Sequence, residues 1–118
     1  MITKKLYPFL IVLILAVNTF AQAPEMMSYQ AVVRGVDNKL VANQAVGMQI
    51  SILQTSAVGT AIYIETHTPI ANANGLVTLQ IGLGTVVSGD FTTIDWSIDD
   101  HFIKTETDPT GGTAYTLA

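Results

Sequence analysis

The sequence has no cysteine and few basic residues, and both shortages limit what it can do. Without cysteine there is no disulfide, no thiolate nucleophile, no cysteine-ligated metal and no attachment point for the lipid of a bacterial lipoprotein. Lys and Arg together number five, against nine Asp and Glu. Because nucleic-acid binding draws on a basic surface, this acidic balance argues against a nucleic-acid partner.

Residues 1–21 have the pattern of a secretory signal peptide. Lys4 and Lys5 precede the apolar run 6–17, and small residues lead up to Ala21, after which cleavage is expected. A membrane-spanning helix needs about 20 apolar residues, whereas this run has only a dozen. The sequence therefore predicts a secreted, extracytoplasmic protein with no integral membrane segment after cleavage. Its three remaining basic residues and nine acidic ones give a net charge of −6.

After a short flexible leader at 22–28, residues 29–118 are expected to form one β domain. Thr, Val and Ile are frequent there, while the helix formers Glu, Lys and Arg are rare. Apolar and polar residues alternate most clearly over 46–52, which predicts a half-buried strand. Further extended segments are expected at 29–34, 40–44, 61–68, 77–81, 101–107 and 114–117, with a short strand or turn at 91–96.

Short strands separated by turns favour an all-β fold, a small antiparallel β-sandwich of the immunoglobulin-like or prealbumin-like kind. The turn at 72–75 is expected to join the strands 61–68 and 77–81 into a hairpin. The final strand candidate stops with the sequence, so the expectation includes a sandwich truncated at its C-terminal end and lacking its last strand.

Gly82-Leu83-Gly84 follows an apolar strand, as does the loop that binds the phosphates of a dinucleotide. Such a loop also needs a helix behind it and a third glycine. Here β-branched residues follow, and Val87 stands where the third glycine belongs. The sequence therefore predicts a strand that ends in a glycine-bearing loop or bulge and no phosphate site.

Histidine and carboxylate side chains raise the question of a metal site. Glu65 and His67 share one face of the strand at 61–68, and His101 beside its neighbouring aspartates would complete a zinc site. Their spacing fits no known ligand pattern, and a solvated strand face would look the same. The aspartates at 90, 95, 99 and 100 would suit calcium but lack the regular spacing of an EF-hand. No serine lies in a Gly-x-Ser-x-Gly setting, so no catalytic residue, metal or cofactor is predicted.

Two aromatic residues are candidate ligand contacts. Trp96, the only tryptophan, would suit stacking on a sugar ring, although a lone Trp in a small sandwich more often lies in the core or at its edge. Tyr63 is expected on the polar face of its strand, where it would join Trp96 in contacting a carbohydrate or a protein.

Several stretches resemble the N-terminal domain of secreted cell-surface proteins of the Bacteroidetes, in which collagen-like or tail-fibre-like regions often follow that domain. The resemblance covers nearly all of the chain after the signal peptide. Its most specific parts are Tyr29-Gln30-Ala31, Asn74-Gly75-Leu76, Ile94-Asp95-Trp96, and Asp108-Pro109 with Gly111-Gly112. The present sequence departs from that pattern at Thr105 and Thr107, where such domains usually have aliphatic residues, and it lacks a further strand that they carry.

The resemblance implies location more than activity, and it supplies no catalytic residue. It implies a non-catalytic structural or adhesive module at the bacterial cell surface, the N-terminal part of a longer fibre-like or surface protein. The alternative is a carbohydrate- or protein-binding module. An uncovered strand edge is also expected to pair with a second copy or with a partner strand, because edge strands present unpaired backbone groups.

Overall fold

A computed structural model describes residues 26–118, so the expected signal peptide and most of the leader lie outside the described residues. The described part is all-β, with seven strands, one turn of 3-10 helix and no α-helix. The elements are β1 (Met27–Val32), β2 (Gly47–Gln54), β3 (Ala61–His67), β4 (Leu76–Ile81), β5 (Thr85–Ser88), η2 (Phe91–Thr93), β6 (His101–Asp108) and β7 (Thr116–Leu117). The predicted all-β fold is confirmed.

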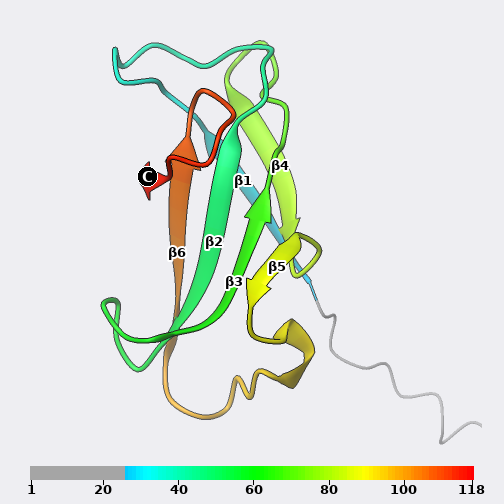
Figure 1. The fold of residues 1–118 in the computed structure, drawn as a ribbon, viewed down its shortest axis with the longest axis vertical. Coiled ribbons are helices and arrows are strands. Elements are labelled where there is room, and N and C mark those ends of the chain that lie inside the picture. The colour runs from blue at the N-terminus through cyan, green and yellow to red at the C-terminus, as the bar shows by residue number, and fades with distance from the viewer. Residues whose placement is uncertain (1–25) are drawn as a thin grey trace, which may run out of the picture.

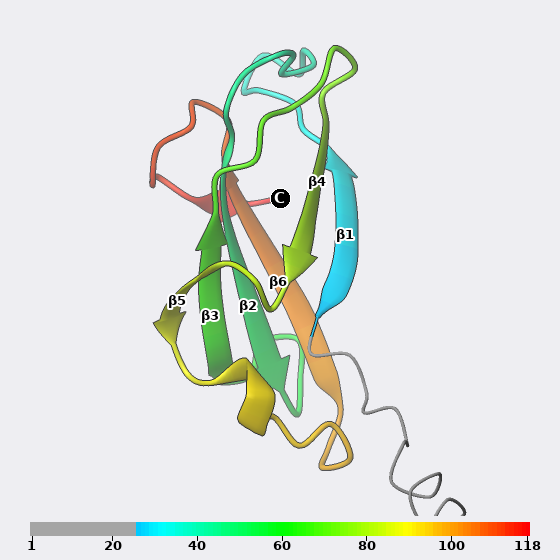
Figure 2. The same ribbon diagram turned by 90° about the vertical axis from the view of Figure 1, so that its right-hand side faces the viewer.

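Two antiparallel sheets form the molecule, one larger than the other. The larger sheet has the strand order β5-β3-β2-β6-β7, and the smaller one pairs β1 with β4 (Figure 1). The view in Figure 2 shows β1 and β4 as a second layer beside the larger sheet. The predicted small antiparallel β-sandwich is confirmed, with a two-stranded layer that is narrower than the sheet it covers.

The core lies between the two layers and follows the alternation of the strands. Met48, Ile50 and Ile52 of β2 point inward and are fully buried. From β4, Val77, Leu79 and Ile81 are buried as well, while the intervening Thr78 and Gln80 face the solvent. Burying such a side chain contributes roughly 1.5–3 kcal/mol, so the packing of these residues between the layers stabilises the sandwich.

The predicted hairpin of 61–68 with 77–81 is wrong, because β3 and β4 lie in different sheets. The connecting chain crosses between the layers, where Val46 N–H donates to the Pro69 carbonyl over 2.8 Å and Ala71 N–H to that of Gln44 over 2.9 Å. The turn at 72–75 does form, with Gly75 at φ 77°, but it follows this crossing. It therefore leads β4 to β1 rather than back to β3.

The two faces of β3 are the reverse of those predicted. Tyr63 and Glu65 are fully buried, whereas Ile62 and Ile64 are only half-buried. The register explains the reversal, because Tyr63 pairs with Ile52 and Glu65 with Ile50, both on the inner face of β2. Paired residues in antiparallel strands share a face. The expected solvated polar face is therefore part of the interior.

The remaining differences concern element bounds. The domain begins two residues inside the expected leader, since β1 starts at Met27. The segment 40–44 is not a strand, and only Leu40 forms an isolated bridge, with Arg34. The segment 91–96 starts with the 3-10 turn η2, which is capped by Asp90. Its Phe91 is buried, and the strand at 114–117 is reduced to the two residues of β7.

Candidate functional site

The glycine loop after β4 binds the side-chain carboxylate of Glu65, which belongs to the same chain. Gly82 N–H donates to Glu65 Oε1 over 2.7 Å, and Gly84 N–H donates to Glu65 Oε2 over 3.0 Å. His67 Nε2 contacts the same Oε2. Glu65 is fully buried, and buried carboxylates need such partners. We call this arrangement of Glu65, His67, Gly82 and Gly84 the Glu65 latch.

Glycine is required at position 84 because the latch leaves no room for a side chain. A Cβ there would lie 2.5 Å from Glu65 Oε2 and 2.7 Å from the Thr66 carbonyl oxygen. Both distances are shorter than any ordinary contact, and one of them is to backbone. The loop is therefore already closed on Glu65, which leaves no space between them for a phosphate.

The histidines and carboxylates proposed for metal binding do not come together. Glu65 and His67 form the latch, whereas His101 packs against Trp96 with ring centroids 5.0 Å apart. Within residues 26–118, no three His, Asp or Glu side chains are placed to hold one ion.

Two of the aspartates weighed as calcium ligands are turn residues. The Asp90 carboxylate accepts hydrogen bonds from the Thr92 N–H and hydroxyl, at 3.0 and 2.7 Å. Asp95 accepts the equivalent pair from Ser97. These bonds favour the charged form and hold the pKa of Asp90 and the pKa of Asp95 below their usual value. Each aspartate therefore closes its own turn.

A row of aromatic rings runs from the core to the surface. Tyr63 meets Phe91 edge-on at 5.3 Å, Phe91 meets Trp96 edge-on at 5.8 Å, and Trp96 then meets His101. Trp96 is 45% exposed and ends the row at the edge of the core. Its half-exposed ring stays a candidate for stacking.

The expectation that Tyr63 contacts a ligand is corrected by the structure. Its ring is at the inner end of the row and is fully buried. Burial, together with the neighbouring Glu65, raises the pKa of Tyr63 above its ordinary value. A ligand at the surface cannot reach this side chain.

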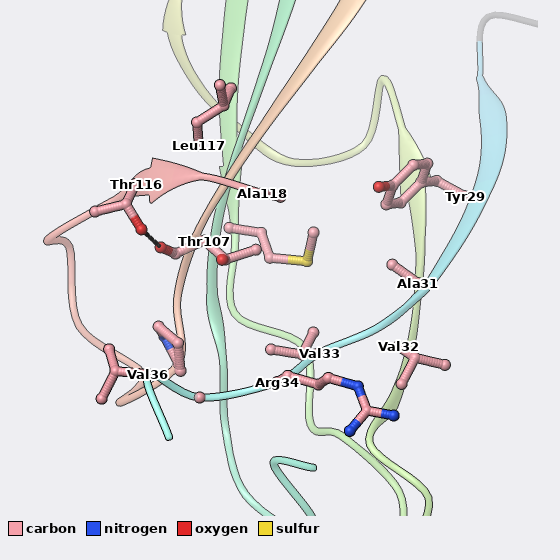
Figure 3. A pocket seen from close by; sticks show the side chains of 13 residues that line it. Tyr29, Ala31, Val32, Val33, Arg34, Val36, Thr107, Thr116, Leu117 and Ala118 are labelled. Atoms are coloured by element: carbon pink, nitrogen blue, oxygen red, sulfur yellow. Dashed lines mark hydrogen bonds between the residues drawn. The ribbon is translucent and has the colours of Figure 1, made fainter. Parts of the chain in front are cut away.

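An open groove lies between the free edge of β1 and the C-terminal strands, and Figure 3 shows it from close by. Its volume is about 400 Å³. We call it the β1–β7 groove. The side chains used below are apolar or hydroxylated: Tyr29, Ala31 and Val33 on the β1 side, and Met48, Thr107 and Leu117 on the other.

The groove exists because β1 and β4 do not cover the whole inner face of the larger sheet. Ile103 pairs with Ile52 and so points toward the inner layer, yet it is 47% exposed. Thr105 and Thr107 occupy the same face and are half-buried. The Tyr29 hydroxyl donates to Thr105 Oγ1 over 3.5 Å across the groove. This side of the core therefore lacks a cover among residues 26–118.

A second hollow of about 310 Å³ lies along the free edge of β6, where Phe102, Ile103, Leu117 and Ala118 line it. Leu117 is 74% exposed between the two hollows. The Ala118 N–H donates to the Thr105 carbonyl over 3.1 Å, so the backbone after β7 continues alongside β6. The edge of β6 from His101 to Lys104 has no neighbouring strand in the described part of the chain.

The turn between β6 and β7 is held by Asp108. Its Oδ1 accepts from the Thr110 N–H at 2.9 Å and from the Thr110 hydroxyl at 2.6 Å, while Oδ2 accepts from the Ala114 N–H at 3.0 Å. These bonds, with those from Thr110 the strongest, lower the pKa of Asp108. Asp108 thereby positions β7 at the rim of the β1–β7 groove.

The fold and the groove define an all-β sandwich domain with an incompletely covered layer and open strand edges. The chain belongs to the family described as Domain of unknown function (DUF8740), whose model matches residues 28–118. No curated protein and no solved structure matches it. In the described part of the chain, no helix has the length and apolarity that crossing a membrane requires.

Sequence reasoning did not find the residues of the open side or those of the latch. Ile103 and Leu117 resemble ordinary strand residues, and only the strand pairing shows that one faces an uncovered layer. Glu65 and the two glycines are 17 and 19 residues apart. One signal in the sequence pointed to the burial of Glu65. Ile50 and Ile52 have to face the core, so the residues that pair with them on the neighbouring strand must face the core as well.

Proposed function

We propose that this chain is a non-catalytic structural or adhesive module, exported to the bacterial cell surface as the N-terminal part of a longer fibre-like or surface protein. Its task is to fold outside the cell and to hold an extended polypeptide segment along its open side. The observation that carries the proposal is the open side of the larger sheet, which comprises the β1–β7 groove and, in the adjoining hollow, the inward-facing Ile103 that is 47% exposed. An uncovered inner face in a small β domain is a site for an added strand.

The chemistry of the open side supports a structural role. The groove is lined by Tyr29, Ala31, Val33 and Met48 together with hydroxyl groups, and Arg34 is its one charged lining residue. The Glu65 carboxylate is already bound by its own chain on both oxygens. Such a surface offers apolar contact and backbone pairing rather than a set of converging reactive groups.

The location and length proposed for the native protein are tested together. An antibody against residues 22–118 is applied to intact native cells, and the captured protein is weighed by mass spectrometry. We expect labelling at the surface and a mass well above the 12.6 kDa of this chain. Labelling that needs lysed cells would contradict export, and a captured mass no larger than this chain would contradict the longer protein.

A carbohydrate-binding role is the second candidate, and half-exposed Trp96 is the observation that favours it. Aromatic rings with one open face stack on sugars, and Phe91 and His101 hold this ring in place. Because Trp96 is the only tryptophan, its fluorescence reports binding directly. A glycan array with Trp96→Ala as control is the test, and equal signals from both proteins would exclude Trp96 as a contact.

A further inference from the structure

The larger sheet ends in two unpaired edges. At one end, β5 pairs only with β3. At the other end, β7 covers only Glu106 and Thr107 of β6, and Ala118 adds one hydrogen bond to Thr105. On the edge turned away from β2, the backbone of His101–Lys104 therefore has no partner strand within residues 26–118.

The two edges carry little of the protection that normally prevents edge pairing: a bulge where β5 pairs with β3, and the one cation Lys104 on β6. Proteins protect edge strands with charges, proline or a covering loop. The β5 edge carries no charge, and its Val86 and Val87 are 55% and 57% exposed. On the β6 edge, Phe102 and Ile103 are 36% and 47% exposed beside the single cation Lys104.

The two edges have matching direction and length. Both β3 and β6 run antiparallel to β2, so they run parallel to each other. Because β5 is antiparallel to β3, it is also antiparallel to β6. A second copy placed beside the first in the same orientation would thus continue the antiparallel alternation. The four residues of β5 match the four unpaired residues of β6.

We propose that β5 of one copy pairs with His101–Lys104 of β6 in the next copy. This inference rests on the proposed function, in which an extended segment covers the open side, and it names a second copy of this chain as the source. Val86 of the incoming strand, which pairs with Glu65 on the inner face, would then lie on the same face as Ile103, and the contact would shield apolar surface on both copies.

The pairing joins two different surfaces of the chain, so it does not close on itself. Such heterologous contacts produce rings or open filaments. Each copy contributes the four strands β5, β3, β2 and β6 before the next begins. With a twist of roughly 20–25° per strand, successive copies are rotated by about 80–100°. The expected product is a short helical chain of copies with a broad distribution of masses.

The net charge of the chain determines the ionic strength at which the association can be observed. Copies of charge −6 repel each other, and salt screens that repulsion over about 10 Å at 0.1 M ionic strength. One short strand pair also forms a small interface, far below the roughly 1,000 Å² of a stable complex. Association is therefore expected at about millimolar concentration and is expected to strengthen with salt.

The test uses sedimentation velocity on residues 22–118 with one edge blocked at a time. Val87→Lys places a charge on the β5 edge, and Ile103→Lys places one on the β6 edge. Val36→Lys is the matched control, because Val36 is fully exposed and lies on neither edge. Circular dichroism and urea midpoints equal to those of the wild type show that each variant is folded.

We expect the wild type and Val36→Lys to associate, and each edge variant alone to associate about tenfold more weakly. An equal mixture of the two edge variants has one intact β5 edge and one intact β6 edge, so it should form pairs and grow no further. That result is specific to β5-to-β6 pairing.

Other results would overturn the inference. A wild type that stays monomeric at about millimolar concentration in high salt has no such pairing. If Val87→Lys associates as the wild type does and Ile103→Lys does not, β6 pairs with β6 and the assignment of β5 is wrong. Either outcome leaves the proposed surface location and native mass untouched, since those are measured on native cells.

Discussion

Replacing Glu65 with glutamine should destabilise the domain strongly, although the shape of the side chain hardly changes. Both carboxylate oxygens accept backbone N–H groups, from Gly82 and Gly84, and Oε2 also contacts His67. Glutamine supplies only one acceptor oxygen, so its NH₂ group must face an N–H donor in the buried latch. The carboxylate therefore holds the loop through its charge and its two acceptors.

The size of this loss follows from the contacts. A hydrogen bond to a charged group contributes about 1.5–3 kcal/mol, and a buried unsatisfied donor costs about 1–3 kcal/mol. Glutamine keeps one of the bonds, so we expect Glu65→Gln to lower the free energy of unfolding by about 2–4 kcal/mol. For a domain of this size that corresponds to a fall in Tm of roughly 10–25 °C.

The assay is urea denaturation followed by the fluorescence of Trp96, the only tryptophan. The matched control is Glu106→Gln, because Glu106 lies on the outer face and contacts Gln49 and Lys104 at 3.3 and 3.6 Å. Exposed pairs of that kind contribute about 0–1 kcal/mol. A Glu65→Gln variant as stable as Glu106→Gln would refute the structural role of the latch.

Three further predictions concern the loops that shape the site. Gly84→Ala should lower the urea midpoint, because its Cβ would lie 2.7 Å from the Thr66 carbonyl; combined with Glu65→Gln it should add less than the sum of the two single losses, since both break one latch. Asn72→Ala should lower stability by about 1 kcal/mol, because Asn72 Oδ1 accepts from the N–H groups of Asn74 and Leu76 at 2.8 and 3.1 Å; an unchanged midpoint would contradict this. The lowered pKa of Asp108 stabilises the fold above about pH 4, the ordinary aspartate value, and that contribution is lost as the pH falls through the folded pKa. The stability difference between wild type and Asp108→Asn should therefore shrink between pH 6 and pH 2, and a constant difference would contradict the prediction.

The sequence was sufficient for the fold class because strand alternation is local. The residues between Val46 and Ile52 alternate, and β2 forms there with its apolar side in the core. The turn at 72–75 was also predictable, because Asn and Gly accept the backbone angles that it needs.

What the sequence could not give is the pairing of elements far apart in the chain. On β3, the apolar Ile62 and Ile64 suggested that their face is the buried one. The register with β2 instead buries the opposite face, because Tyr63 pairs with the inward-facing Ile52. The burial of Glu65 is possible only because the Gly82–Gly84 loop reaches it from the end of β4. Local alternation contains neither fact, so the hairpin and the solvated face were wrong predictions.

The candidate site was predictable only in part. An uncovered strand edge was expected from the short C-terminal strand, and in the described part of the chain β7 leaves most of the β6 edge that faces away from β2 unpaired. The β1–β7 groove depends on how far a two-stranded layer reaches across a five-stranded one. How much of the larger sheet is covered depends on how the two layers pack, and nothing in the sequence around Ile103 indicates that it is left uncovered.

The absence of cysteine makes it possible to test directly whether the open side is covered in the native protein. Ile103→Cys and the control Ile70→Cys each carry one thiol, and Ile70 is exposed but lines neither the β1–β7 groove nor the second hollow. Their rates of reaction with a water-soluble maleimide are compared in purified residues 22–118 and on the surface of intact cells. We predict that both thiols react in the dilute purified domain, and that on cells Cys at position 103 reacts at least about tenfold more slowly while Cys at position 70 is unchanged. If the rate on cells fell by the same factor at both positions, the claim that an extended segment covers the open side would be contradicted.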